Sequence, residues 1–486
     1  MATSRGVQNN CRKGNCLIIS ILILSTFTQV DANFFSRLLK RKGGDEKGAQ
    51  APSGVTAAVG SEAHVGSIVT YEDGMLMGIL SNNNKIPLVG VGVGNAHHAH
   101  VASIVADAIQ DDKMIRLIDT AHASHNEHLV VDGMMAGFET LLDGRDDESK
   151  KIQIHVVTKV WYTHLGYDRT KIAVEESLAE FQSVIDNEMI DFKLHVLLHW
   201  PRCYTSIPWM ECEKEEEELP DHVKEAGPNP ANDPDAWKES WKLLEDMYLS
   251  DKYPIASIGV SNFHLEEITE MDTFSRIHPH ILQMNIWTLL FDSALVDHCH
   301  QRRIHVQVFN TIQGTVMRPD VAPRAYHHIQ KVANEMSDEN DTVVTPAQVI
   351  LGWLIQHGVS VIPRTSRLAR LEENSAVSLA NLPAFTDMQV ETVAHAVEAY
   401  LSGNDLPSDI HVSVSFHAVN KDIMLYWQDS EGNEVRIAHV KQGEVFNETT
   451  YPNHVFRAYD ASNKDIFQEH QINANFGDHR SIHVEL

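Results

Sequence analysis

The chain has 486 residues, and 39 Lys and Arg residues against 67 Asp and Glu residues give it a net charge of −28 at neutral pH. Apolar residues make up 43% of the chain, which allows a substantial core and excludes wholesale disorder. The negative charge argues against sequence-independent binding to nucleic acid, five Cys residues exclude a disulfide-rich scaffold, and the lack of apolar runs near 20 residues excludes a multi-pass membrane protein.

Residues 1–32 have the pattern of a secretory signal peptide. Basic residues between Arg5 and Lys13 precede a short apolar run, residues 16–27, and Ala32 offers a small residue at a plausible cleavage point. An uncleaved anchor is the alternative, but about a dozen apolar residues are short for a membrane span. The next residues, 33–58, are rich in Gly, Ala, Ser and charge, which predicts a flexible linker.

From residue 85 onward, short β-rich runs alternate with helical patterns. The eight predicted strands are residues 86–91, 114–118, 152–158, 194–198, 255–260, 281–285, 304–309 and 359–362. Such βα units with nearly continuous apolar strands predict an α/β fold, a closed TIM (β/α)8 barrel, within residues 59–403. An open doubly wound sheet is the alternative. It is weakened because no Gly-x-Gly-x-x-Gly sequence opens a helix with an acidic residue at the expected offset.

Residues 203–235 interrupt the fourth βα unit. They contain six Glu residues between positions 211 and 218, followed by several Pro and Gly residues. A solvated loop is favoured over an acidic recognition patch. The segment follows the carboxyl end of a strand, which is the catalytic face of such a barrel. Cys203 and Cys212 could form a disulfide in an oxidising lumen.

After residue 404 the pattern changes to short alternating runs separated by turns, which predicts a small all-β sandwich over residues 404–486. The last four residues, His-Val-Glu-Leu at 483–486, resemble retention signals of the endoplasmic reticulum, although Val484 replaces the usual acidic residue. Sequons at Asn340 and Asn447 suggest glycosylation. Together with the signal pattern, these features predict a protein of the endoplasmic reticulum lumen.

Three chemically useful side chains stand at the ends of predicted barrel strands. Asp119 follows the second strand, Lys159 the third and His199 the fourth. Because the carboxyl ends of barrel strands meet at one mouth, these side chains are expected to form an acid–base site. Taken singly, each has an ordinary alternative: a helix cap, a surface lysine and a core histidine.

The chain resembles the aldo-keto reductases over about residues 85–401. The motifs occur in the family's order: DTA…NE at 119–127, TKVW at 158–161, LLHWP at 197–201, IGVSNF at 258–263, LQMN at 282–285 and IPRT…R…EN at 362–374. The resemblance implies reduction of a small carbonyl substrate with hydride from NADPH. It also implies that Asp119, Lys159 and His199 correspond to the family's Asp, Lys and His.

The family's proton-donating Tyr has no counterpart, because its position holds Ser124. Ser is a much weaker acid than a phenol, and losing a positioned general acid typically costs about 10²–10⁴-fold. A water held by Ser124, the neighbouring His125 or Tyr162 are candidate substitutes.

The resemblance also implies an NADP(H) site. The implied cofactor residues are Ser261, Asn262 and Gln283 at the nicotinamide carboxamide, Phe309 stacked on its ring, Arg364, Thr365 and Arg370 at the 2′-phosphate, and Glu373 and Asn374 at the adenine.

His-rich spots at residues 97–100 and 298–300 lack a complete, separated ligand set, so no metal is predicted.

Residues 410–472 resemble the β-domain of the von Hippel-Lindau tumour suppressor, which binds a hydroxyproline. The resemblance rests on the Leu-Tyr-Trp run ending at Trp427 and on the segment from Thr450 to Phe456. It implies a pocket of Trp427, Thr450 and His454 for a protein or peptide partner. A plain sandwich core is the alternative.

The whole chain is therefore interpreted as an NADPH-dependent aldo-keto reductase-like enzyme of the secretory lumen, fused to a β-sandwich binding module. The alternative is a pseudoenzyme that binds NADPH and acts as a sensor or adaptor. Ser124 favours this alternative, whereas Lys159 and His199 favour the enzyme.

Overall fold

The computed structural model describes residues 69–143, 151–250, 252–312, 320–340, 342–365, 367–406, 411–428, 433–451, 454–474 and 478–486. The predicted signal peptide and linker lie outside the described residues. Within these ranges, no helix combines the length and apolar character that crossing a membrane would require.

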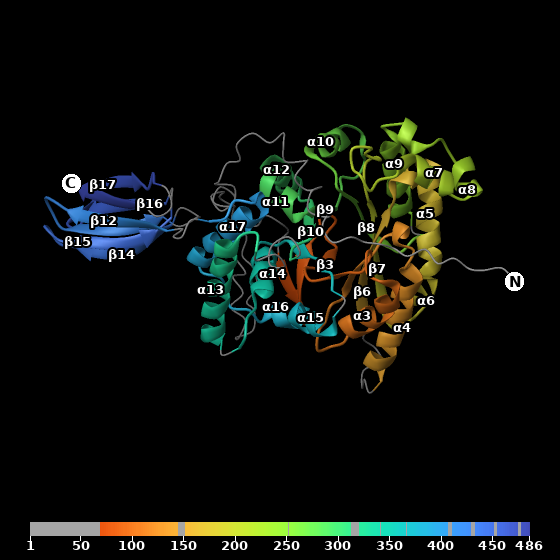
Figure 1. Ribbon diagram of the computed structural model, residues 1–486, viewed down its shortest axis with the longest axis horizontal. Helices are drawn as coiled ribbons and strands as arrows, with labels where there is room; N and C mark the ends of the chain where they lie inside the picture. Colours follow the sequence, from red (N-terminus) through yellow and green to blue (C-terminus); the bar gives the residue numbers. More distant parts are fainter. Residues whose placement is uncertain are drawn as a thin grey trace.

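Eight parallel strands form a barrel at the centre of the larger part of the molecule, with helices around it (Figure 1). An isolated parallel bridge between Val89, which lies just before the first barrel strand, and Val361, in the last one, closes the sheet. The predicted TIM barrel is therefore confirmed. Its strands, in sheet order, are β4 (Val91–Gly92), β5 (Leu117–Asp119), β6 (Ile152–Val160), β7 (Ile190–Leu198), β8 (Ile255–Ser261), β9 (Ile281–Asn285), β10 (His305–Phe309) and β11 (Ser360–Val361).

Helices surround the barrel and bury their apolar faces against it. Local caps define several of their ends. Thr345 and Gln348 form a reciprocal capping box at the start of α14, and the backbone of Gly403, in the left-handed conformation, ends α17. The helices are α3 (His98–Ala108), α4 (Glu127–Leu142), α5 (Tyr167–Glu180), α6 (Gln182–Ile185), α9 (Ala236–Tyr248), α10 (Leu265–Phe274), α11 (Ile286–Phe291), α12 (Ser293–Arg302), α13 (Pro323–Asn340), α14 (Pro346–Gln356), α15 (Leu368–Glu373), α16 (Ala376–Ala380) and α17 (Asp387–Ser402).

The prediction of one strand over residues 86–91 is wrong. The chain there forms two strands: β3 (Lys85–Pro87), which pairs antiparallel with β2 (Met75–Ile79), and β4 of the barrel. With β1 (Val69–Glu72), β2 and β3 make a small sheet at the amino-terminal end of the barrel, where a Cβ added at Gly78 would lie 2.8 Å from His305 Cε1. This sheet therefore closes the end opposite the predicted active site.

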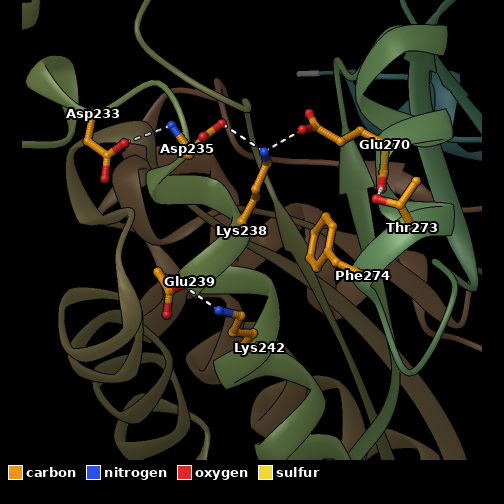
Figure 2. A pocket seen from close by; sticks show the side chains of 8 residues that line it. All are labelled: Asp233, Asp235, Lys238, Glu239, Lys242, Glu270, Thr273 and Phe274. Carbon is orange, nitrogen blue, oxygen red and sulfur yellow. Dashed lines mark hydrogen bonds and ion pairs between the residues drawn. The ribbon is translucent and has the colours of Figure 1, made fainter.

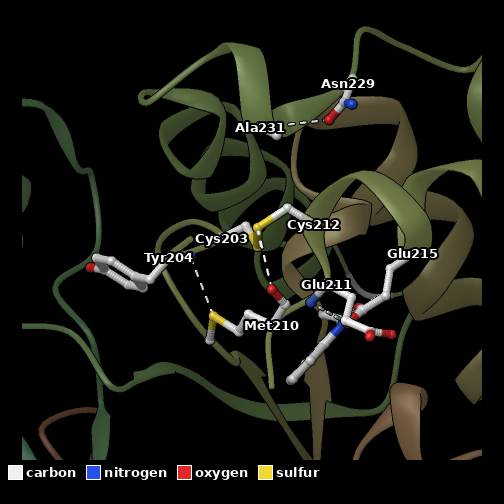
Figure 3. The surroundings of a disulfide bond; sticks show 9 residues. Cys203, Tyr204, Met210, Glu211, Cys212, Glu215, Asn229 and Ala231 are labelled. Carbon is white, nitrogen blue, oxygen red and sulfur yellow. Dashed lines mark hydrogen bonds between the residues drawn. A yellow bond between two sulfur atoms is a disulfide. The ribbon is translucent and has the colours of Figure 1, made fainter. Parts of the chain in front are cut away.

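The insertion after β7 is more ordered than the predicted solvated loop. It contains two short helices, α7 (Cys212–Glu218) and α8 (Asp221–Glu225). Cys203 and Cys212, whose pairing the sequence left open, form a disulfide (Figure 3). The Glu run lies on α7, and some of its carboxylates bind other parts of the barrel, as described below.

The carboxyl-terminal residues form a separate pair of sheets, drawn in blue at one end of Figure 1. The two sheets share an apolar core of their own, which includes Val414, Phe416, Leu425 and Phe456. The predicted all-β module is therefore confirmed. One sheet has the order β15 (Val445–Thr450), β12 (Val412–Ala418), β18 (His479–Val484), and the other has the order β14 (Glu434–Val440), β13 (Ile423–Gln428), β16 (Val455–Asp460), β17 (Asn463–Gln471).

The retention-like tetrapeptide is part of this sandwich. His483 and Val484 belong to β18, where Val484 pairs with Ala418 and is buried. The Glu485 carbonyl accepts a hydrogen bond from Gln468 Nε2 at 2.8 Å. The tetrapeptide is thus held by strand pairing.

Candidate active site

Asp119 and Lys159 form a buried ion pair at the barrel mouth. Asp119 is the last residue of β5, Lys159 lies near the end of β6, and the Lys159 Nζ to Asp119 Oδ1 distance is 2.7 Å. Lys159 Nζ also donates to the Thr120 carbonyl at 2.7 Å, and Gln283 Nε2 donates to Asp119 Oδ1 at 2.7 Å. These bonds compensate the cost of burying the two charges and fix the ammonium in place.

His199 stands beside this pair, directly after β7. Burial, reinforced by the Lys159 charge, lowers the pKa of His199 well below its ordinary value. The imidazole is therefore neutral at pH 7 and can donate one hydrogen bond to a carbonyl oxygen. Asn262 Nδ2 donates to the His199 carbonyl at 3.0 Å, so the end of β8 supports the backbone of this residue.

Ser124 lies on a short 3-10 turn (His122–Ser124) that follows β5. Its N–H donates to the Ala121 carbonyl at 2.9 Å, and a Cβ added at Gly94 would lie 3.2 Å from Ser124 Oγ and 3.9 Å from Thr120 Cα. The turn is braced by Thr120 Oγ1, which donates to Asn126 Oδ1 at 2.6 Å. Ser124 therefore lies next to Thr120, whose carbonyl accepts a hydrogen bond from Lys159. A serine side chain, however, has no phenol group.

Tyr162 and His125, the two side chains considered as substitutes for the missing Tyr, lack surroundings that would activate a proton donor. Tyr162 is buried, and burial together with the Glu215 carboxylate raises its pKa, which makes it a poorer acid than a free phenol. His125 is exposed, and its pKa is lowered by partial burial and by the neighbouring His122 and His98. The clearest proton-bearing group at the mouth is therefore the Lys159 ammonium.

Three indoles, which we call the indole wall, stand next to His199: Trp161, Trp200 and Trp209. The Trp161 ring lies edge-on to the His199 ring, with centroids 4.8 Å apart. Trp209 stacks on Trp161 at 6.3 Å and meets Trp200 edge-on at 5.8 Å. Trp209 is 48% exposed, so this wall offers an apolar surface beside the acid–base residues.

The residues assigned to the nicotinamide lie at the ends of consecutive strands. Ser261 ends β8, and Asn262 follows it in the left-handed conformation and donates to Ser261 Oγ at 3.2 Å. Gln283 lies on β9, and Phe309, which is half-buried, ends β10. The barrel thus gathers all four at the mouth that holds Asp119 and His199.

The residues assigned to the adenosine end lie after β11 and on α15. Arg364 and Arg370 are exposed, whereas Thr365 is buried with its Oγ1 accepting from Arg367 N at 3.0 Å. Glu373 accepts from Thr345 Oγ1 at 2.5 Å, so part of its carboxylate is already used. Asn374 is buried, and its Oδ1 has no hydrogen-bond partner among the described residues. Two exposed guanidinium groups and an unpaired buried amide oxygen fit a phosphate and an adenine amino group.

Sequence reasoning missed three groups that complete the site. They are the Thr120 carbonyl, which binds Lys159, Gln307, whose Oε1 accepts from Gln283 Nε2 at 2.7 Å, and Glu215, which accepts from Trp161 Nε1 at 2.7 Å. A backbone acceptor has no sequence signal. Glu215 belongs to a run of Glu residues, and only the position of α7 in the structure shows that it is the one that binds Trp161.

A cavity of about 350 Å³ lies away from this site. It lies between α9 and α10, and Figure 2 shows Lys238 reaching Asp235 and Glu270 across it, with Phe274 nearby. Its charged groups are already paired with one another, and the predicted site residues do not line it. Over the described ranges, no group of three or more His, Cys, Asp or Glu side chains is arranged to hold a metal ion.

The residues predicted to form a pocket in the β-sandwich do lie together. The Trp427 and His454 ring centroids are 5.3 Å apart, and Thr450 Oγ1 lies 2.7 Å from His454 Nδ1. However, His454 Nε2 lies 2.8 Å from Glu391 Oε1 on α17, and the Tyr451 hydroxyl donates to the Met388 carbonyl at 3.3 Å. A peptide would therefore have to displace α17 to reach His454.

The barrel part of the chain is similar to known proteins. The aldo/keto reductase family model matches residues 89–398. The uncharacterized oxidoreductase YtbE of Bacillus subtilis is 27% identical over 301 residues, covering 61% of this chain and 85% of YtbE. The glyoxal reductase of Bacillus subtilis is 26% identical over 300 residues, covering 61% and 85%. A solved Bombyx mori aldo-keto reductase in complex with NADP is 23% identical, with coverage of 68% and 92% and a TM-score of 0.47. With its family match spanning most of the chain and its barrel mouth built as described, this chain belongs to the aldo/keto reductase family.

Proposed function

We propose that the chain reduces a small aldehyde or ketone to an alcohol with NADPH. The observation that carries this proposal is the buried Asp119–Lys159 pair beside a neutral His199 at the barrel mouth. A carbonyl oxygen that takes up charge during reduction is stabilised by a fixed cation and a neutral hydrogen-bond donor. The indole wall next to His199 favours flat, apolar or aromatic carbonyl compounds.

We propose NADPH as the cofactor because the residues at the adenosine end fit its extra phosphate. Arg364 and Arg370 supply exposed guanidinium groups, and Asn374 supplies an unpaired buried amide oxygen. Ser261 and Gln283 supply polar groups at the other end of the mouth. When bound, NADPH supplies the hydride for the carbonyl carbon.

The proton for the resulting alcohol is assigned to Lys159 Nζ, directly or through a water held by Ser124. An ammonium has three N–H donors, and two of them are directed at Asp119 and the Thr120 carbonyl. The third remains for a substrate oxygen or a water. His199, being neutral, holds the same oxygen in place.

A pseudoenzyme is the second candidate, and Ser124 is the observation that favours it. Without a phenol, the chain would bind NADPH with little turnover and serve as a sensor or adaptor. The β-sandwich would then provide the partner surface, with the contact between His454 and Glu391 joining it to α17. The resemblance of residues 410–472 to the von Hippel-Lindau β-domain, which implies a pocket for a protein or peptide partner, is part of this second proposal.

We propose a location in the secretory pathway, in the lumen of the endoplasmic reticulum. The Cys203–Cys212 disulfide supports this proposal, because such bonds persist in oxidising compartments. The tetrapeptide at residues 483–486 supports it less, because Val484 is buried in β18. Finding the tagged protein in the cytosol with reduced Cys203 and Cys212 would contradict the proposal.

The reductase proposal is tested by measuring NADPH binding first and NADPH oxidation second, with a panel of aldehydes that includes aromatic ones. The enzyme is expected to bind NADPH and to oxidise it only with an aldehyde present. Lys159→Met is expected to abolish oxidation and to leave binding intact. NADPH binding without turnover on any aldehyde would favour the pseudoenzyme.

A further inference from the structure

Helix α7 is held against the barrel mouth at three places by three nearby residues. Cys212 is bonded to Cys203, which lies just beyond the end of β7 (Figure 3). Glu215 Oε2 accepts from Trp161 Nε1 at 2.7 Å. Glu216 binds the buried Arg169 of α5 through both carboxylate oxygens, at 2.8 and 2.9 Å.

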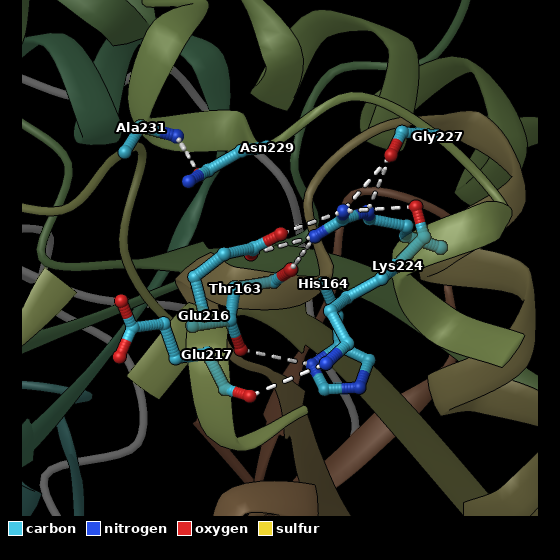
Figure 4. A network of polar contacts seen from close by, with 9 residues as sticks. Thr163, His164, Glu216, Glu217, Lys224, Gly227, Asn229 and Ala231 are labelled. Atoms are coloured by element: carbon cyan, nitrogen blue, oxygen red, sulfur yellow. Dashed lines mark hydrogen bonds and ion pairs between the residues drawn. The ribbon is translucent and has the colours of Figure 1, made fainter. Parts of the chain in front are cut away.

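The third contact is the stronger of the two non-covalent ones that hold this helix. Arg169 also donates to the Thr163 and Gly227 carbonyls, so the guanidinium is satisfied on several sides by groups that Figure 4 shows around Glu216. Bidentate pairing of a buried Arg with a carboxylate is geometrically demanding. The position of α7 is therefore set relative to α5 and does not depend on the acidic run as a whole.

The second contact leads directly to the candidate active site. Trp161 is half-buried, its ring centroid lies 4.8 Å from that of His199, and Trp209 stacks on it. Glu215 is the hydrogen-bond acceptor that orients this indole. Losing it would leave the Trp161 N–H unpaired in a partly buried place, which costs free energy and lets the ring turn.

We propose that α7 is a clamp for the indole wall and that Glu215 is a positioning residue, which acts on the carbonyl site through Trp161. This inference rests on the proposed reductase function and extends it to a residue remote from the reacting atoms. A substrate that packs on Trp161 and hydrogen-bonds to His199 is held correctly only while Glu215 fixes the indole.

The test compares Glu215→Ala with Glu215→Gln, which keeps an acceptor for the indole, and with Glu213→Ala, which removes an exposed carboxylate from the same helix. Glu215→Ala is expected to lower kcat/KM for an aromatic aldehyde by about 10–100-fold, because small misplacements of a substrate are costly. Glu215→Gln is expected to restore most of the loss, and Glu213→Ala to stay within about twofold of the intact protein. The affinity for NADPH should be unchanged in all three.

A double-mutant cycle with Trp161→Phe shows whether the effect passes through the indole. Phe has no N–H, so adding Glu215→Ala to Trp161→Phe is expected to cost little more than Trp161→Phe alone. Fully additive losses would overturn the proposal, and so would an equal loss in Glu215→Ala and Glu213→Ala.

Near-ultraviolet circular dichroism keeps the inference testable if the reductase proposal fails and no aldehyde is reduced. Stacked indoles give a signal that depends on their mutual orientation, and only Glu215→Ala, not Glu213→Ala, is expected to change it in the folded protein. An unchanged signal in Glu215→Ala overturns the positioning role of Glu215, whatever the outcome of the activity assays.

Discussion

Acid should destabilise the barrel because of four histidines that the proposed reaction does not use. This histidine layer consists of His155, His195, His280 and His305, all buried inside the amino-terminal half of the barrel. His155 Nδ1 lies 2.9 Å from His195 Nε2, and His305 Nε2 lies 2.6 Å from Ser360 Oγ. Such rings fit the interior only as neutral groups.

The pKa values give the sign and size of the effect. Burial lowers the pKa of His155 and His305 to about 3 and that of His280 to about 4, from an ordinary 6.5. A lowered histidine pKa means that the unfolded chain takes up protons first, so stability is full above pH 6.5 and falls as the pH drops towards the folded values. At about pH 5, each ring lowers the free energy of unfolding by about 2 kcal/mol. Three such rings give about 6 kcal/mol, comparable with the total stability of many domains.

The assay is urea unfolding followed by circular dichroism between about pH 7.5 and about pH 5. His305→Gln, which cannot titrate, is expected to lose about 2 kcal/mol less over this range than the intact protein. His327→Gln changes an exposed histidine on α13 and should leave the pH dependence as it was. A free energy of unfolding that stays constant from pH 7.5 to pH 5 would refute the reasoning.

Three further predictions concern the two binding regions and the proton donor. Ser124→Tyr is expected to raise the rate of NADPH-dependent aldehyde reduction by up to about 10²–10⁴-fold, and the gain should be lost when Lys159→Met is added. A Ser124→Tyr variant that binds NADPH but reduces aldehydes no faster would contradict this prediction. Arg370→Ala is expected to remove most of the preference for NADPH over NADH, measured as two dissociation constants, and equal affinities in the intact protein would count against the assignment. Glu391→Gln removes the charge that faces His454 and is expected to speed hydrogen exchange in α17 and β15, so unchanged exchange would show that the contact contributes nothing.

The barrel and the convergence of its strand ends could be predicted because both follow from local patterns. Asp119, Lys159 and His199 each follow an apolar run, and parallel strands place their carboxyl ends on one side. The split of residues 86–91 could not be predicted in this way. An apolar run of six residues has no period that marks a change of sheet, and the change depends on contacts such as the close approach of Gly90 to Leu117.

The role of α7 escaped prediction for a different reason. A run of Glu residues is typical of a solvated surface, and its sequence does not single out Glu215 or Glu216. Their partners, Trp161 and Arg169, lie 54 and 47 residues earlier in the chain. Only the folded barrel brings a buried Arg to a carboxylate that the sequence pattern assigns to solvent.

Ser124 stands where the resemblance places a proton-donating Tyr, and the ion pair near it is intact. Lys159 is held by Asp119 and by the Thr120 carbonyl, and neither bond involves the side chain of residue 124. The cation therefore stays at the mouth, and any acidic group placed there, whether a water or a phenol, is easier to deprotonate next to it. His199 keeps its neutral ring for the same reason, since the Lys159 charge and burial both oppose its protonation. In the reduction proposed above, the proton that follows hydride addition therefore comes from Lys159 or from water, and Ser124 changes the rate of that reaction and not its type.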